Sequence, residues 1–434
     1  MRVEGLVVNY EDARAGRSWT LDGGMLALDL TGGETKLTGE VALLSGRAYA
    51  SRARLVYESP RGSPAARIGL TMIDVAATDV ASQSPALAWL GVVDAPLSLS
   101  LRAEVDANGA LGPVGLALKM AAGALRPDPA APPVGFDLAR AYLSWNPEDQ
   151  TLRFDRVEVR SDWGSVRGEG QAALQDIVNG LPRSLIGQFT LRQIVIDPPG
   201  LYPEPLRWDQ AGAQFRLRLQ PFALEVAQAD VALGGDEGLT LSGRVRTPDG
   251  GWEVALDARA GRLGRDRILA LWPQGWRPGL RAWLETNLLE GALRGLAASL
   301  RLSEGQRPQF AVTSRFEGTS LRPLPSHPPI EQASGLLSWD EAGLAVSLDA
   351  GTLWPAQGGA LRLDGSALVI PPPEQTPAPR RRRGCICGRK APSRRRCRCS
   401  TCRPGASSAG PVCPWRWPRG RQGWPARWIC AWGG

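Results

Sequence analysis

Hydrophobic and polar residues alternate with a period of two through most of residues 1–374. This spacing places every second side chain on the same face and is typical of a half-buried β-strand. Three runs supply candidate residues for one apolar face, and these are Leu97, Leu99, Leu101, Val105, Phe215, Leu217, Leu219, Val254 and Leu256. The intervening positions are mostly Ser, Arg, Glu or Asp. The pattern therefore predicts a mainly β protein, built as a long antiparallel meander.

Turn and bulge signals separate these runs. Asp106-Ala-Asn-Gly109 has turn composition, and the alternation slips between Phe154 and Val157, which indicates a bulge. An aliphatic residue, one further residue and a glycine recur at Leu37–Gly39, Leu241–Gly243 and Leu363–Gly365. We interpret these motifs as bends between strands, because their unequal spacing excludes a fixed-period repeat.

Two short regions break the strand pattern. Ser84-Pro85 combines a capping residue with proline at the first helical position, and it predicts a short helix through Leu90. A helical insert is expected at about 265–290, in two pieces separated by Trp272-Pro273, with the second piece ending at Gly291 and strands resuming by Leu296. Packing against a sheet edge or end is the simplest role for both.

One-sided alternation is compatible with a sandwich, a barrel, or a long curved sheet with an apolar inner face. The strand-like region of about 370 residues exceeds one ordinary sandwich. The chain has only 5 Tyr, whereas an outer-membrane barrel carries aromatic girdles at both interfaces. Period two alone does not choose between the sandwich and the curved sheet.

Composition excludes most familiar catalytic designs in residues 1–374. All seven cysteines follow residue 384, and the single histidine, His327, lies in a Pro-rich stretch. Thiolate metal sites, cysteine nucleophiles and histidine triads therefore lack their parts. The adjacent carboxylates, such as Asp340-Glu341, suit solvated turns. We expect no catalytic residue, no metal site and no cofactor, and hence no enzyme.

No stretch of 18 apolar residues is present, so no transmembrane helix is expected. Met1-Arg-Val-Glu-Gly5 is not followed by the apolar region of a secretory signal. Strand-like sequence begins at once, which suggests that the true N-terminus is missing and that this chain is an internal fragment.

Residues 375–434 have a different composition. They hold 15 basic residues and no acidic ones, whereas residues 1–374 hold 36 Lys and Arg against 43 Asp and Glu. Cys399-Ser-Thr-Cys402 has zinc-ligand spacing without a second matching pair, and the Arg runs with nearby Trp suggest nucleic-acid binding. Reading the segment one base out of frame, with CGN arginine codons, restores strand-like alternation. We therefore favour a frameshifted, disordered tail and expect no nucleic-acid partner.

Three stretches resemble the AsmA-like superfamily of Gram-negative envelope proteins, in its large branch with TamB and YhdP. They span residues 84–291, and a similar alternation of apolar and polar residues continues on either side. The first is Ser84–Leu90 with the strand Ala95–Leu101, and the second is Tyr142–Leu152 followed by Val166–Gly170. The third is Leu271-Trp-Pro273 with Arg281-Ala-Trp-Leu284 and Leu288-Leu-Glu-Gly291.

The resemblance implies a long sheet bent into a U-shaped groove with an aliphatic interior. It implies phospholipid as the partner, a periplasmic location, and an inner-membrane anchor formed by an N-terminal helix that this chain lacks. Family members are thought to carry phospholipid from the inner to the outer membrane. The alternative is a structural or outer-membrane assembly scaffold that binds other envelope proteins through exposed strand edges.

Overall fold

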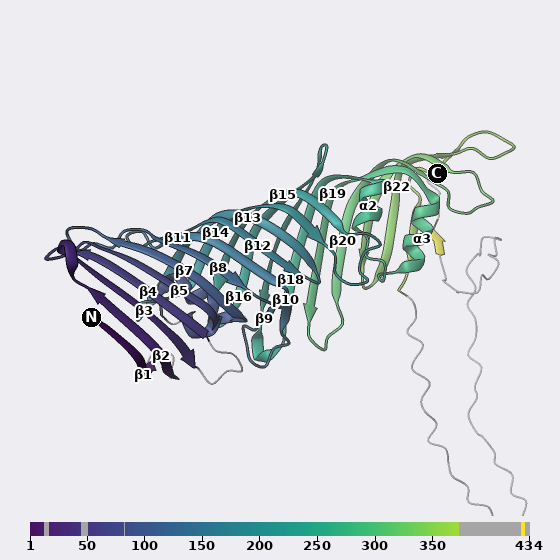
Figure 1. Cartoon of the computed structure of the whole chain (residues 1–434). Coiled ribbons are helices and arrows are strands. Elements are labelled where there is room, and N and C mark those ends of the chain that lie inside the picture. Colours follow the sequence, from purple (N-terminus) through teal and green to yellow (C-terminus); the bar gives the residue numbers. More distant parts are fainter. Residues whose placement is uncertain (13–16, 45–50, 82, 373–426, 430–434) are drawn as a thin grey trace, which may run out of the picture.

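The computed structural model describes residues 1–12, 17–44, 51–81, 83–372 and 427–429. Its main feature is a single antiparallel sheet of 22 strands, in which each long strand pairs with the next along the chain. Figure 1 shows the strands side by side along one elongated body, with the strand direction turning progressively, as sheet twist requires. The predicted mainly β meander is therefore confirmed.

The first half of the sheet consists of ten strands connected mainly by short turns. Their bounds are β1 (Arg2–Asp12), β2 (Arg17–Asp29), β3 (Glu34–Leu44), β4 (Ser51–Pro60), β5 (Ala66–Ala76), β7 (Pro96–Val105), β8 (Val114–Met120), β11 (Leu138–Asn146), β12 (Thr151–Ser161) and β13 (Gly164–Val178).

The second half continues in the same order. Its strands are β14 (Leu181–Ile196), β15 (Leu206–Arg218), β16 (Ala223–Gly234), β17 (Glu237–Arg246), β18 (Glu253–Gly264), β19 (Leu288–Ser303), β20 (Gln309–Leu321), β21 (Ile330–Asp340), β22 (Gly343–Leu353), β23 (Leu361–Arg362), β24 (Ala367–Ile370) and β25 (Arg427–Ile429). Both β23 and β24 pair with β22, and β25 pairs with β24.

Small elements are inserted between the long strands. A second sheet of three strands joins β6 (Val93–Asp94), β9 (Gly123–Leu125) and β10 (Val134–Phe136). The helices are η1 (Thr31–Gly33), α1 (Ala77–Ala81), η2 (Pro85–Val92), η3 (Pro248–Gly250), α2 (Arg265–Leu271) and α3 (Pro278–Asn287). The described helices include none that is long and apolar enough to cross a membrane.

The local signals at Ser84 and Asp106 act as predicted. The Ser84 hydroxyl accepts a hydrogen bond from the Ala86 amide at 3.3 Å and caps η2, which is a 3₁₀ helix. Asp106 accepts hydrogen bonds from the amides of Asn108 and Ala110, both at 2.8 Å, and closes the β7–β8 turn. The bulge expected near Phe154 is present in the pairing of β12 with β13.

Two predictions about glycine were wrong. Helix α3 ends at Asn287, and β19 begins at Leu288, because the backbone there already pairs with Leu321 of β20. Gly291, expected as the helix end, lies inside β19 with φ 138°. The helical insert is thus shorter than 265–290, whereas strand structure has resumed by Leu296, as predicted.

Gly39 and Gly243 are not bends but lie inside β3 and β17, whereas Gly365 does lie in a turn with φ 77°. A Cβ at Gly243 would lie 2.3 Å from the carbonyl oxygen of Ala255 on the neighbouring strand. Glycine is required there for close backbone approach rather than for a turn.

Candidate functional site: the apolar face of the sheet

Strand register lines up apolar residues across the whole sheet. One residue from each of twenty successive strands pairs with its counterpart on the next strand, and none of the twenty is polar. We call this line the apolar row; it consists of Val3, Leu26, Gly39, Leu55, Leu70, Leu101, Leu116, Leu143, Phe154, Gly170, Phe189, Ala213, Ala229, Leu241, Ala258, Ala298, Val312, Trp339, Leu344 and Ile370. At about 4.8 Å between strands, the row is roughly 90 Å long.

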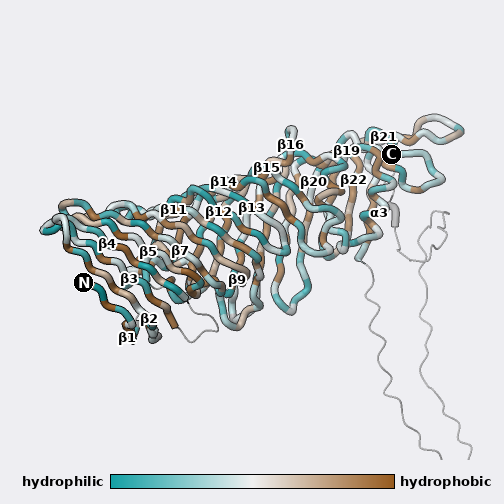
Figure 2. The backbone as a smooth tube through the Cα atoms, in the orientation of Figure 1, coloured by the Kyte–Doolittle hydropathy of each residue, from teal (hydrophilic) through white to brown (hydrophobic). Residues whose placement is uncertain are grey.

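The opposite face of the same sheet is polar. A neighbouring register line runs through Glu4, Met25, Glu40, Arg54, Thr71, Ser100, Ala117, Ser144, Arg153, Gln171, Gln188, Gln214 and Gln228. Figure 2 shows the resulting alternation of brown and teal along the strands. From β1 to β16 the sheet therefore presents one apolar face and one polar face.

The apolar row is open in some stretches and covered in others. From β1 to β7 its residues are partly exposed, with Leu26 at 40 % and Leu55 at 36 % exposure. At β8, β11 and β12 its members Leu116, Leu143 and Phe154 are buried. From Gly170 in β13 to Val312 in β20 every member is partly exposed again. We call this second stretch, about 35 Å long at the strand spacing, the central open stretch.

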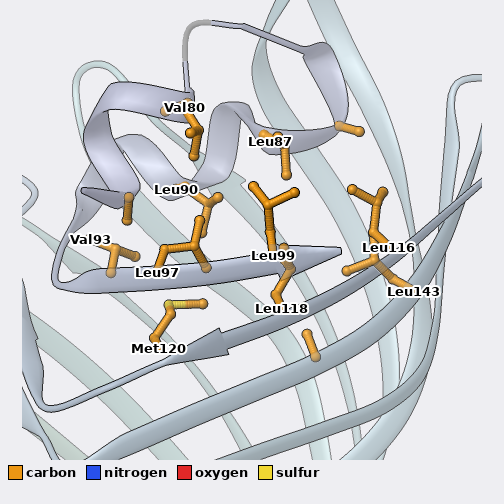
Figure 3. Packing of buried hydrophobic residues seen from close by; sticks show 14 of the residues in the cluster. Val80, Leu87, Leu90, Val93, Leu97, Leu99, Leu116, Leu118, Met120 and Leu143 are labelled. Carbon is orange, nitrogen blue, oxygen red and sulfur yellow. The ribbon is translucent and has the colours of Figure 1, made fainter. Parts of the chain in front are cut away.

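The first cover is formed by α1 and η2. Leu87 and Leu90 of η2 point at Leu97 and Leu99 of β7, and the cluster continues through β8 and β11 (Figure 3). Leu90 and Leu97 are fully buried. Burying such a side chain contributes about 1.5–3 kcal/mol to stability. The first cover is therefore part of the hydrophobic core and is packed against the sheet.

The second cover lies near the other end. Trp272 and Trp276, which follow α2, stack on Trp339 of the apolar row with ring centroids 5.6 and 4.5 Å apart. Arg265 holds this insert in place, because its guanidinium donates to the carbonyl oxygens of Glu285, at 2.8 Å, and Leu288 at the end of α3. Trp339 is consequently buried while the next row member, Leu344, is partly exposed.

Aromatic rings join the first cover to the central open stretch. Trp89 of η2 meets Phe154 at 6.3 Å between ring centroids, Phe154 meets Phe189 at 5.2 Å, and Phe189 meets Phe215 at 5.6 Å. Glycines make room for these rings: a Cβ at Gly187 would lie 2.5 Å from the Phe215 ring. The phenylalanines therefore lie over the neighbouring backbone instead of projecting from the face.

The structure places eight of the nine sequence-predicted residues on the apolar side of their strands, and Leu219 lies in the turn after β15. Leu97 and Leu99 are buried beneath η2, and Leu219 is buried in the same cluster. Leu101, Val105, Phe215, Leu217 and Val254 are partly exposed, and Leu256 is 36 % exposed. The open residues Phe215, Val254 and Leu256 lie on neighbouring register lines of β15 and β18, beside the central open stretch.

Sequence reasoning did not single out three aromatic residues in or beside the central open stretch, namely Phe189, Trp276 and Trp339. Their side chains meet only through contacts between elements far apart in sequence, so no local pattern marks them. A bulky aromatic residue paired across strands with glycine, as Phe189 pairs with Gly170, is visible in the sequence only once the register is known.

The sequence analysis considered His327 and the acidic residues as candidates for catalysis or metal binding. His327 lies in a loop, its Nδ1 3.1 Å from the Ser326 hydroxyl. In the part of the chain that the structure describes, no three His, Cys, Asp or Glu side chains are grouped so as to hold a metal ion. The zinc, nucleic-acid and frameshift predictions fall on residues 375–434, which lie outside the described residues except for β25.

Comparison with known proteins adds no relative: no family model matches the chain, and neither a curated protein nor a solved structure matches it.

Proposed function

We propose that this chain is part of an AsmA-like envelope protein whose sheet forms a U-shaped groove, with the apolar face inside, that binds phospholipid acyl chains. On this proposal it conducts phospholipid between the inner and outer membranes of a Gram-negative cell, in the periplasm, and is not an enzyme. The observation that carries the proposal is the apolar row, which runs through twenty strands without a polar residue.

The exposure of this face supports the proposal. In a sandwich, a second sheet would bury the inner residues, as residues of a packed core are buried. Here Phe215, Val254 and Leu256 stay partly exposed, and no second sheet covers them among the described residues. Polar residues occupy most of the adjacent positions of these strands, on the opposite face. An extended, accessible apolar strip marks an interaction site, and a ligand-binding groove is one kind of site that fits it.

Dimensions and energetics fit an acyl chain. Each CH₂ removed from water contributes about 0.8 kcal/mol, so a 16-carbon chain gains roughly 10 kcal/mol or more from an apolar lining. A hydrocarbon core of about 30 Å is two acyl chains deep, so the central open stretch of about 35 Å is long enough for two chains end to end. A one-sided strip would leave the headgroup in water, and no catalytic side chain is needed.

The test is native extraction of the whole chain from a Gram-negative host, followed by mass spectrometry of co-purifying lipids. One or more phospholipids per chain, retained through gel filtration, is the expected result. A folded, monodisperse and lipid-free protein would overturn the proposal.

A further inference from the structure

The polar face holds a cluster of arginines around one buried carboxylate. Glu158 of β12 has Arg140 of β11 and Arg167 of β13 as its direct cross-strand partners, and Arg156 and Arg160 lie two residues away along its own strand. All five side chains therefore project from the same face. Four guanidinium groups and one carboxylate give this cluster a net charge of +3.

Glu158 is held by these arginines from several sides. Its Oε1 accepts from Nη2 of Arg160 at 2.8 Å and from Nε of Arg160 at 3.1 Å, and it lies 3.6 Å from Nη2 of Arg167. Its Oε2 lies 3.4 Å from Nη2 of Arg156. The carboxylate is 3 % exposed, whereas the side chains of Arg156, Arg160 and Arg167 are 44–54 % exposed. The carboxylate thus fixes the guanidinium groups from beneath, and their outer N–H groups face solvent.

Burial and the arginine charges act in opposite directions on Glu158. Burial raises the pKa of this carboxyl, but the hydrogen bond from Arg160 and the charges of Arg167, Arg160 and Arg140 outweigh it, so the pKa is lowered. Nearby acids do not balance the remaining charge, because Glu169 pairs with Arg192 at 3.2 Å and Asp155 pairs with Arg153 at 3.3 Å.

A β-bulge opens a hollow beside the cluster. The pairing of β13 with β14 shifts between Ser165 and Arg167, and Gln193 opposite adopts φ 51°. The hollow measures about 430 Å³ and is lined by Glu158, Arg160, Ser165, Val166, Arg167, Gln193 and Val195. This volume lies within the range of roughly 300–1,000 Å³ that is common for ligand pockets.

The donors around the hollow suit an oxyanion. Arg167 uses Nη1 to donate to Oε1 of Gln193 at 2.8 Å and directs Nη2 toward Glu158, which fixes its plane. Arg160 is fixed through Nε and Nη2, so its Nη1 faces away from the carboxylate. A guanidinium carries five N–H donors, and two oriented guanidinium groups beside a hydroxyl from Ser165 match the several oxygens of a phosphate group.

We propose that the hollow formed by Arg160, Arg167, Ser165 and Gln193 on the polar face is a binding site for a phosphate group, carried either by a small soluble compound or by a lipid headgroup at a membrane surface. The site lies on the face opposite the apolar row, so it does not depend on the proposed lipid conduit. A lipid-free preparation would refute the conduit and leave this site untouched.

Titration calorimetry of the whole chain with inorganic phosphate, at constant ionic strength, tests the site. The expected result is saturable binding with one phosphate per chain. Binding should weaken by about tenfold in Arg167→Gln, because a charged hydrogen bond is lost while Arg160 still pairs with Glu158. The control Arg216→Gln removes an exposed arginine from the same face, away from the cluster, and should leave binding unchanged. The basic residues after 375 are common to all variants.

A second variant keeps the test decisive if Arg167→Gln fails to fold. Ser165→Asp introduces a carboxylate beside Arg160 and Arg167, so it should preserve thermal stability and abolish phosphate binding. Equal phosphate binding by the wild-type chain and both variants would overturn the site.

Vesicles distinguish the two sources of the phosphate group. If vesicles of phosphatidylglycerol bind less to Arg167→Gln than to the wild type, and inorganic phosphate competes with them, the ligand is a lipid headgroup. If vesicle binding does not depend on Arg167 while phosphate binding does, the ligand is a soluble phosphate compound.

Discussion

Replacing Leu256 with aspartate places one charge in the open part of the apolar face. Leu256 of β18 lies between Gly243 of β17 and Leu300 of β19 and is 36 % exposed. An ionised side chain at this exposure can reach water while no acyl chain covers the apolar face, so the fold should be retained. An acyl chain lying on Gly243 and Leu300 would, in contrast, exclude that water.

The expected magnitude follows from burial. Full burial of a leucine contributes about 1.5–3 kcal/mol, so the exposed third of Leu256 would contribute about 0.5–1 kcal/mol on contact with an acyl chain. An unpaired polar group in an apolar contact costs about 1–3 kcal/mol on mutational scales. Together the change is about 1.5–4 kcal/mol, which corresponds to roughly tenfold to a thousandfold weaker binding.

The assay is the molar ratio of co-purified phospholipid to protein, with a titration of a fluorescent fatty acid for the affinity. Leu336→Asp is the matched control, because Leu336 is 48 % exposed on the polar face, between Arg315 and Ser347. It should bind lipid like the wild type. The reasoning is refuted if Leu256→Asp keeps full lipid occupancy, or if both variants lose it equally while remaining folded by circular dichroism.

The other predictions concern stability. Leu90→Ala, at a fully buried position under the first cover, should lower the free energy of unfolding in urea by about 2–5 kcal/mol, whereas Val7→Ala at a 63 % exposed position should change it by less than about 0.5 kcal/mol. Gly187→Ala should destabilise by about 1–3 kcal/mol because its Cβ meets the Phe215 ring, and Phe215→Leu should recover part of that loss in the same urea assay; no recovery would contradict the ring contact. Because the pKa of Glu158 is lowered in the folded state, its contribution is present above the ordinary glutamate pKa of about 4.3 and is lost as the pH falls through the lower folded value. Thermal melts from pH 6 to pH 3 should therefore show a steeper loss for the wild type than for Glu158→Gln, and parallel slopes would argue against the arginine pairing.

Residue spacing determined the fold class and which residues of one strand share a face. Leu97, Leu99 and Leu101 lie on one face of β7, and Val254 and Leu256 lie on one face of β18, because the side-chain period of a strand is two whatever its neighbours are. Capping chemistry was equally local, since Ser84 and Asp106 make hydrogen bonds within a few residues of themselves.

Glycine was misread because its role here is set by the adjacent strand. Gly243 faces the backbone of Ala255 and Gly291 lies against Thr319, and both partners belong to the next strand of the sheet. The end of α3 was misplaced for the same reason: Leu288 joins β19 because Leu321 is available to pair with it.

What the sequence alone determined about this protein is therefore the repeating unit: apolar and polar positions alternate, turns close the hairpins, and Pro and Ser begin the short helices. Only the tertiary structure decided which apolar positions are core and which are surface. Leu99 is 4 % exposed and Leu256 is 36 % exposed although their local patterns are alike. The difference arises because η2 packs on Leu99 and no such element packs on Leu256 among the described residues, and the position of a covering helix depends on long-range packing that a period of two does not encode.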